Sequence, residues 1–311
     1  MLKIVIFSKI KKEKKQMKKI VSLLMAVLLV AAVFVGCSKG PKDYSLAIGV
    51  AVSSDSSDQT VAAIVTDANG KIVLCRVDCV SYTAEFTNGA LDTTAPTSKV
   101  ALGEYYKMPS GTWAAQTAHL ESFVIGKTQS EVAAIALNGG KLTDAELSTK
   151  CTFVVSDILK AIDNAFKSEH KVSFKSASET FTAGLNAIAK VSAVENDATG
   201  ANLVVDYAAA VLVDGAVVAS ILDCTDVTFN KITDGAAESV DFAGTKRVQG
   251  DAYKMTSGAW YVQADAYAVS AVGKTAADID GLATEGVAGC TMPYSQYNFK
   301  AVISAAVKGA R

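Results

Sequence analysis

The chain has 311 residues; half are hydrophobic, 20% are charged, only four are proline, and the formal net charge is −1. This composition supports packed cores and excludes a wholly disordered or proline-rich linker protein. The near-zero charge and the two histidines exclude a strongly basic nucleic-acid binder and a histidine-rich metal site. The length predicts about two ordinary domains.

The first 36 residues carry signals of export. Eight lysines and one acid come before an apolar run over residues 20–35, which is followed by Gly36 and Cys37. This order is typical of a secretory signal peptide, which has a basic start, an apolar middle and a small residue at the cleavage site. The run of 16 residues is short for a membrane-spanning helix, which needs about 20. An uncleaved anchor helix is the alternative.

The end of the apolar run, residues 34–37, resembles a bacterial lipobox. By that resemblance Cys37 becomes the lipidated first residue of the mature protein, and residues 37–43 form a tether. We expect anchoring to the outer face of the bacterial cytoplasmic membrane, or to an outer membrane if the host has one. A complete signal peptide also begins at Met17, so we interpret Met17 rather than Met1 as the start.

The chain that remains after export is acidic. Beyond residue 36 it holds 22 basic and 30 acidic residues, a net charge of −8. This charge disfavours direct binding to nucleic acid or to an anionic membrane surface. The membrane contact that we expect is therefore the lipid alone.

An internal repeat organises the rest of the sequence. Residues 103–113 match residues 250–260 at seven of eleven positions, with an offset of 147. The register continues on both sides, with small drifts that indicate insertions in loops. The repeat predicts two copies of one domain, residues 44–168 and 180–311, joined by a polar linker at 169–179.

Each predicted copy has strands first and helices after. Strand-like runs, rich in Val and Ile and alternating with polar residues, cover residues 46–52, 61–66 and 72–86. Apolar residues at helical spacing predict helices over residues 113–125, 158–166 and 299–307. This order indicates an α+β fold with a mainly antiparallel sheet in each copy.

Local signals predict turns and helix starts. Asn69-Gly70 and Asp214-Gly215 lie between strand-like runs and predict hairpin turns, because these residue types tolerate positive φ. Thr128 and Thr275 are each followed three residues later by an acid, which predicts capped helix N-termini.

Several motifs favour structural over catalytic interpretations. Gly126-Lys127-Thr128 lacks the glycine that a phosphate loop needs five positions earlier, so we expect a helix cap. His119 has Ala266 as its counterpart, which favours a solvated or capping histidine. The repeated Trp113 and Trp260 favour core packing over a rim around a planar ligand. No constellation supports a catalytic or metal site.

The dipeptide Cys-Thr occurs at equivalent positions in both copies. Thr152 follows Cys151, and Thr291 follows Cys290 shortly before the last predicted helix. The second occurrence, with Gly289, resembles the flavin-attachment segment of the FMN-binding domain family, whose pattern is Asp-x-x-Ser-Gly-Ala-Thr. In that family FMN is joined to the threonine through a phosphodiester. The resemblance implies covalent FMN on Thr291 and on Thr152.

The function that the resemblance implies is a lipid-anchored electron carrier, with a flavin transferase and a redox partner. Glu285, Ala288 and Cys290 depart from the family's Asp, Ser and Ala, and Lys150 fills the glycine position in copy one. The alternative is therefore a non-redox ligand-binding or scaffold lipoprotein that kept the fold without flavin.

Five cysteines follow Cys37. The repeat-consistent disulfides are Cys79–Cys151 and Cys224–Cys290, which leave Cys75 free. The alternative is buried thiols that act as small apolar residues.

Overall fold

The computed structural model describes residues 40–311 except 54–56, 88, 196, 235 and 293–296. The predictions for the signal peptide, for Met17 and for Cys37 fall outside the described residues. Within the described part of the chain, no helix combines the length and apolar character needed to cross a membrane.

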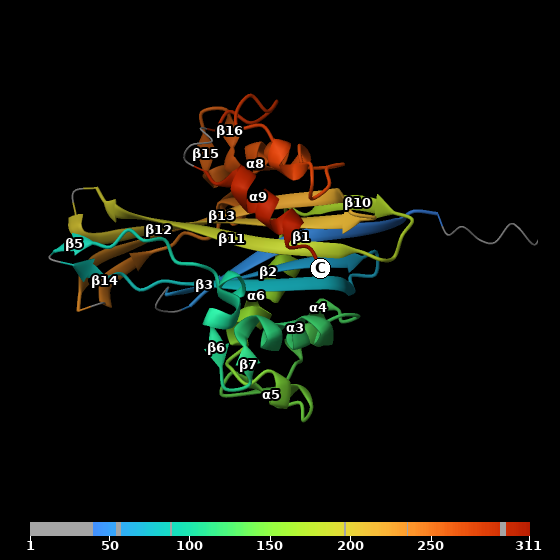
Figure 1. Cartoon of the computed structure of the whole chain (residues 1–311), viewed down its shortest axis with the longest axis horizontal. Coiled ribbons are helices and arrows are strands. Elements are labelled where there is room, and N and C mark those ends of the chain that lie inside the picture. The colour runs from blue at the N-terminus through green and yellow to red at the C-terminus, as the bar shows by residue number, and fades with distance from the viewer. Residues whose placement is uncertain (1–39, 54–56, 88, 196, 235, 293–296) are drawn as a thin grey trace, which may run out of the picture. The chain divides into compact units, whose positions relative to one another are not determined.

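Two four-stranded antiparallel sheets form the centre of the fold (Figure 1). The first has the order β10-β1-β2-β3, and the second has the order β11-β12-β13-β14. The first sheet contains β1 (Lys42–Val52), β2 (Asp58–Asp67), β3 (Ile72–Ser81) and β10 (Val172–Ser176). The second contains β11 (Thr182–Val194), β12 (Asp197–Val213), β13 (Ala216–Thr233) and β14 (Ala236–Asp241).

Helices and small hairpins follow the first three strands of the first sheet and all four strands of the second. Between β3 and β10 of the first sheet come α2 (Lys99–Leu102), η1 (Gly103–Tyr105), α3 (Trp113–Phe123), α4 (Gln129–Ala133), α5 (Leu147–Lys150) and α6 (Ser156–Lys167). After the second come α7 (Lys246–Gln249), η2 (Gly250–Ala252), α8 (Trp260–Val269), η3 (Ile279–Gly281) and α9 (Phe299–Lys308). The two-stranded hairpins pair β4 (Phe86–Thr87) with β5 (Ala90–Leu91), β6 (Lys107–Met108) with β7 (Gly111–Thr112), β8 (Leu137–Asn138) with β9 (Lys141–Leu142), and β15 (Lys254–Met255) with β16 (Gly258–Ala259).

The elements stack in four layers, helices–sheet–sheet–helices. In Figure 1, α8 and α9 lie on one side of the strands, and α3, α5 and α6 lie on the other. One apolar cluster contains side chains of both sheets, so the sheets face each other. Two further clusters each join one sheet to its own helices. The N-terminal half (residues 42–176) and the C-terminal half (residues 182–311) therefore share one central core.

Side-chain alternation places each strand between two cores. In β2, Val61, Ala63 and Val65 face the central cluster, whereas Ala62 and Ile64 face the helices. Successive side chains of a strand point to opposite faces, so both faces of this strand are covered. The near-continuous apolar sequence of β2 follows from that double burial.

Two glycines let the last helix of each half, α6 or α9, lie directly on a strand. A Cβ at Gly49 of β1 would lie 2.1 Å from the backbone nitrogen of Ala165 in α6. A Cβ at Gly184 of β11 would lie 1.7 Å from the carbonyl oxygen of Ala306 in α9. Only glycine permits such close backbone approach.

The structure confirms the α+β class, the mainly antiparallel sheets and both hairpin turns. Gly70, Asp214 and Gly215 all have positive φ. The strand predicted over residues 72–86 ends earlier, at Ser81. The stretch predicted as a linker contains β10, which pairs with β1.

The predicted helix start at Thr275 is wrong. Thr128 forms a complete capping box with Glu131 at the start of α4. The Thr275 hydroxyl instead donates to Asp278, and only a turn and the short η3 follow. Asp278, Asp280 and Gly281 are poor helix formers, which explains why no α-helix propagates there.

Candidate functional site

The two predicted flavin sites have the same hydrogen bonds. The N–H and hydroxyl of Thr152 both donate to Gln116 Oε1, at 2.9 and 3.0 Å. The N–H and hydroxyl of Thr291 donate to Gln263 Oε1, both at 2.9 Å. Each glutamine is buried on the first long helix of its half, α3 or α8. Their amide nitrogens donate to the carbonyls of two hairpin glycines, Gly111 and Gly258.

This geometry fits flavin attachment poorly. A phosphodiester removes the hydroxyl proton, so the threonine oxygen would face the glutamine oxygen with no hydrogen between them. Rotating the amide would remove the acceptor of the threonine N–H and the bond to the hairpin. Thr152 is also half-buried beside Lys150, whereas Thr291 is exposed and follows Gly289 at positive φ. The Gln–Thr contacts instead fix the Cys-Thr loops onto the helices.

The predicted disulfides do not form. Cys75, Cys79, Cys151 and Cys224 are free, buried thiols. Burial raises the pKa of Cys79 and of Cys151 to about 11, so these groups stay protonated at neutral pH. They pack with the apolar clusters beside the helices, because each lies on the helix-facing side of its sheet or in the adjoining loop. Cys290 is buried in the same kind of position.

The structural interpretations of the other motifs are confirmed. His119 is exposed on α3. Trp113 and Trp260 are buried in the helix-facing clusters.

Buried aspartates cap the short helices, a role that sequence reasoning missed. Asp78 Oδ1 accepts from the N–H of Cys79 at 2.7 Å and of Val100 in α2 at 3.0 Å. Asp223 Oδ1 accepts from the N–H of Cys224 at 2.8 Å and of Arg247 in α7 at 3.1 Å. Burial raises the pKa of both carboxyls, that of Asp78 to about 6. The recurrence of Asp-Cys in both repeats was the available signal.

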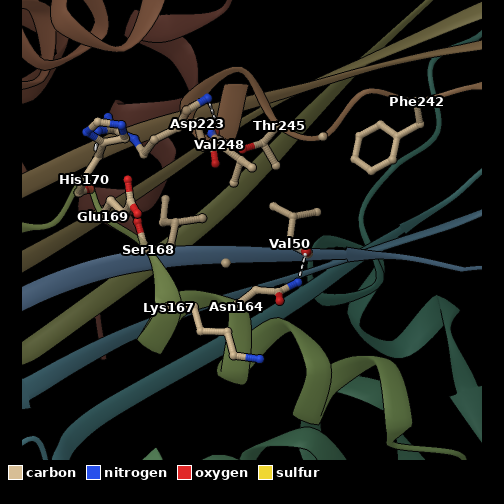
Figure 2. Close-up of a pocket in the computed structure, with 14 residues that line it drawn as sticks. Val50, Asn164, Lys167, Ser168, Glu169, His170, Asp223, Phe242, Thr245 and Val248 are labelled. Carbon is tan, nitrogen blue, oxygen red and sulfur yellow. Dashed lines mark hydrogen bonds between the residues drawn. The ribbon is translucent and has the colours of Figure 1, made fainter. Parts of the chain in front are cut away.

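A cavity of about 430 Å³ lies between the two halves (Figure 2). One wall comes from β1 and the end of α6, and the other comes from β13, the segment after β14, and α7. Figure 2 shows Glu169 and His170 toward one end of the cavity and Phe242 toward the other. The volume lies within the range of small-molecule sites, about 300–1,000 Å³.

The apolar part of the cavity includes two side chains that remain exposed. Val248 is 72% exposed and Phe242 is 37% exposed. Ile48 and Val50 of β1 line the cavity as well, and Val50 O accepts from Asn164 Nδ2 at 2.8 Å. Exposed apolar side chains that gather at a concave site are typical of ligand contact.

The polar wall is formed by three consecutive residues after α6. Ser168, Glu169 and His170 line the cavity. Across the described residues, neither the Glu169 carboxylate nor the Ser168 hydroxyl has a hydrogen-bond partner, while the His170 ring stacks on Tyr261 with centroids 4.0 Å apart. Two of these polar side chains are therefore available to a bound molecule.

The cationic side chains that line the cavity already have partners. Arg247 donates to Asp265 Oδ1 at 2.6 Å and to the Leu222 carbonyl at 2.7 and 2.9 Å. Lys167 is ion-paired with Asp163. Sequence reasoning did not find this cavity, since its residues come from four segments that lie up to 200 positions apart along the chain.

Comparison of the chain with protein-family models, with curated proteins and with solved structures finds no match.

Proposed function

We propose that this chain is an exported, lipid-anchored binding protein, built from two copies of one domain, that takes a small ligand in the cavity between the copies. The observation that supports this proposal most directly is the cavity itself, where an apolar surface with exposed Val248 and Phe242 faces the unpartnered Glu169. A mixed apolar and polar concave site between two halves is the usual setting of ligand binding.

Equivalent contacts in the two halves support the two-copy origin. The Gln116–Thr152 and Gln263–Thr291 contacts have matching geometry. The aspartate caps of α2 and α7 also match, as do Gly49 and Gly184 beneath α6 and α9. Residues at offsets of 135 to 147 positions thus perform the same structural task in residues 44–168 and 180–311.

Binding of a neutral apolar dye, N-phenyl-1-naphthylamine, tests the proposal. We expect fluorescence enhancement with the full mature chain, and a several-fold weaker enhancement in a Phe242→Ala, Val248→Ser double variant. Val262→Ser is the matched control, because Val262 is 51% exposed on α8, outside the cavity. Equal enhancement in all three proteins would exclude the cavity as the binding site.

A covalent-flavin electron carrier is the second candidate. It is favoured by the exposure of Thr291, which a flavin transferase could reach without opening the core. Co-expression with a flavin transferase and in-gel fluorescence test it. The expected result is a fluorescent band that Thr291→Ala abolishes and Thr152→Ala leaves. A colourless wild-type chain eliminates this candidate and leaves the first intact.

A further inference from the structure

We infer that the ligand of the cavity is a small organic cation, an amine with an aryl or alkyl body. This inference rests on the proposed function and concerns the same cavity. The ammonium group would lie near Glu169, and the apolar body would lie along Val50, Phe242 and Val248.

The charges around the cavity support a cation. Lys167 and Arg247 line the cavity, but each is paired with its own carboxylate, Asp163 and Asp265. The donors of Arg247 are further occupied by the Leu222 and His170 carbonyls. Both cations are therefore already neutralised by a carboxylate of the chain before any ligand binds.

The carboxylates are not balanced in the same way. Glu169 has no ion-pair partner among the described residues. Asp223 also lines the cavity, but it is buried, it accepts from the backbone N–H groups of Cys224 and Arg247, and the Arg247 guanidinium lies near it. The uncompensated charge at the wall is therefore that of Glu169, and this negative charge attracts a cation and repels an anion.

The shape of the cavity requires an apolar body beside the charge. Glu169 and Phe242 lie toward opposite ends of the cavity in Figure 2, with Val50 between them. An inorganic cation would leave this apolar surface exposed to water, whereas an aryl or alkyl amine covers it. The described residues also contain no cluster of His, Cys, Asp and Glu that could hold a metal ion.

Displacement of N-phenyl-1-naphthylamine by two probes of opposite charge tests the inference. Phenethylamine and phenylacetate have similar bodies and opposite charges at neutral pH. Because one exposed carboxylate contributes up to about 1 kcal/mol, or roughly fivefold in affinity, we expect phenethylamine to compete about fivefold more strongly. Glu169→Gln should remove that preference while the dye still binds. Glu146→Gln, a change of another exposed glutamate outside this cavity, should preserve it.

The outcomes separate this inference from the function on which it rests. If the dye binds and phenylacetate competes as well as phenethylamine, the cation inference is wrong and the binding function stands. The same holds if the preference survives Glu169→Gln. If the dye does not bind the wild-type chain, the proposed function fails and the inference fails with it.

Discussion

The two junctions between the halves differ in how they are filled. Where α9 ends, Arg311 exchanges backbone hydrogen bonds with Ala183 at 3.2 and 3.4 Å and donates to Glu121 at 3.1 Å. Arg76 donates to the Ala183 carbonyl at 3.0 Å and contacts both Glu121 and the Arg311 carbonyl. Where α6 ends, His170 stacks on Tyr261, and the space beside it is the cavity.

This difference shows that two halves that share sequence motifs can have different tasks. The junction at Arg311 is closed by charged groups that satisfy one another around a carboxylate that is only 4% exposed. The junction at His170 leaves a carboxylate and two apolar side chains open to solvent. The first arrangement fixes the halves together, and the second leaves room for another molecule. The following variants test this contrast.

Glu121→Ala should have the largest effect on stability. It leaves Arg76 and Arg311 without their carboxylate and removes the acceptor of the Val77 N–H, which lies 2.9 Å away. Removing one partner of a buried ion pair typically costs about 3–5 kcal/mol. Urea unfolding of the mature chain measures the change. The control is Glu146→Ala, whose exposed pair with Lys150 should contribute less than about 1 kcal/mol.

Asp78→Asn should change the dependence of stability on pH. Burial raises the Asp78 pKa from 3.8 to about 6, so folding favours the neutral carboxyl. The stabilisation is therefore complete below pH 4 and is lost as the pH rises to about 6, a total of about 3 kcal/mol. Asparagine keeps the acceptor oxygen and cannot ionise. Thermal unfolding between pH 4 and 7 should show the wild-type chain losing stability relative to the variant.

Asp223→Asn is the equivalent substitution in the other half, at a residue that lines the cavity. Burial raises the pKa of Asp223 as well, but the nearby Arg247 guanidinium stabilises its charged form. We therefore expect Asp223→Asn to change the pH dependence of stability in the same direction as Asp78→Asn, but by a smaller amount. Parallel pH profiles for the wild-type chain and Asp78→Asn would contradict the assignment of this pH dependence to Asp78.

Gln116→Ala and Gln263→Ala should destabilise the chain by similar amounts, about 2 kcal/mol each. Each change removes an acceptor that serves two threonine donors and a donor that serves a hairpin carbonyl. A hydrogen bond typically contributes about 0.5–1.5 kcal/mol. Unfolding in denaturant measures both. A marked inequality would show that the two Cys-Thr loops do not share one structural role.

Val248→Ser should have the smallest effect on stability, within about 0.5 kcal/mol, because the side chain is 72% exposed. Its effect should appear in dye binding instead. Destabilisation by more than about 1 kcal/mol would mean that the valine supports the fold rather than a ligand.

The sequence alone predicted the local structure well, for physical reasons that act over a few residues. Period-two alternation predicted the strands. Asn69-Gly70 and Asp214-Gly215 predicted the hairpins because these residue types tolerate positive φ, which Gly70, Asp214 and Gly215 adopt. Thr128 and Glu131 lie close enough in sequence to form their capping box without other help. The large apolar area of Trp113 and Trp260 likewise indicated burial.

Only the tertiary structure decided how these elements combine. Tyr207 donates to Gln59 at 2.8 Å across 148 positions of sequence, in a central core to which both halves contribute. Cys79 and Cys151 are buried free thiols in the same helix-facing cluster, not the disulfide that the repeat predicted. The cavity has no signal in the sequence because Glu169, Phe242 and Val248 are ordinary residues until the packing of two sheets brings them to one concave surface. Local chemistry therefore determined the elements, and long-range packing determined the site.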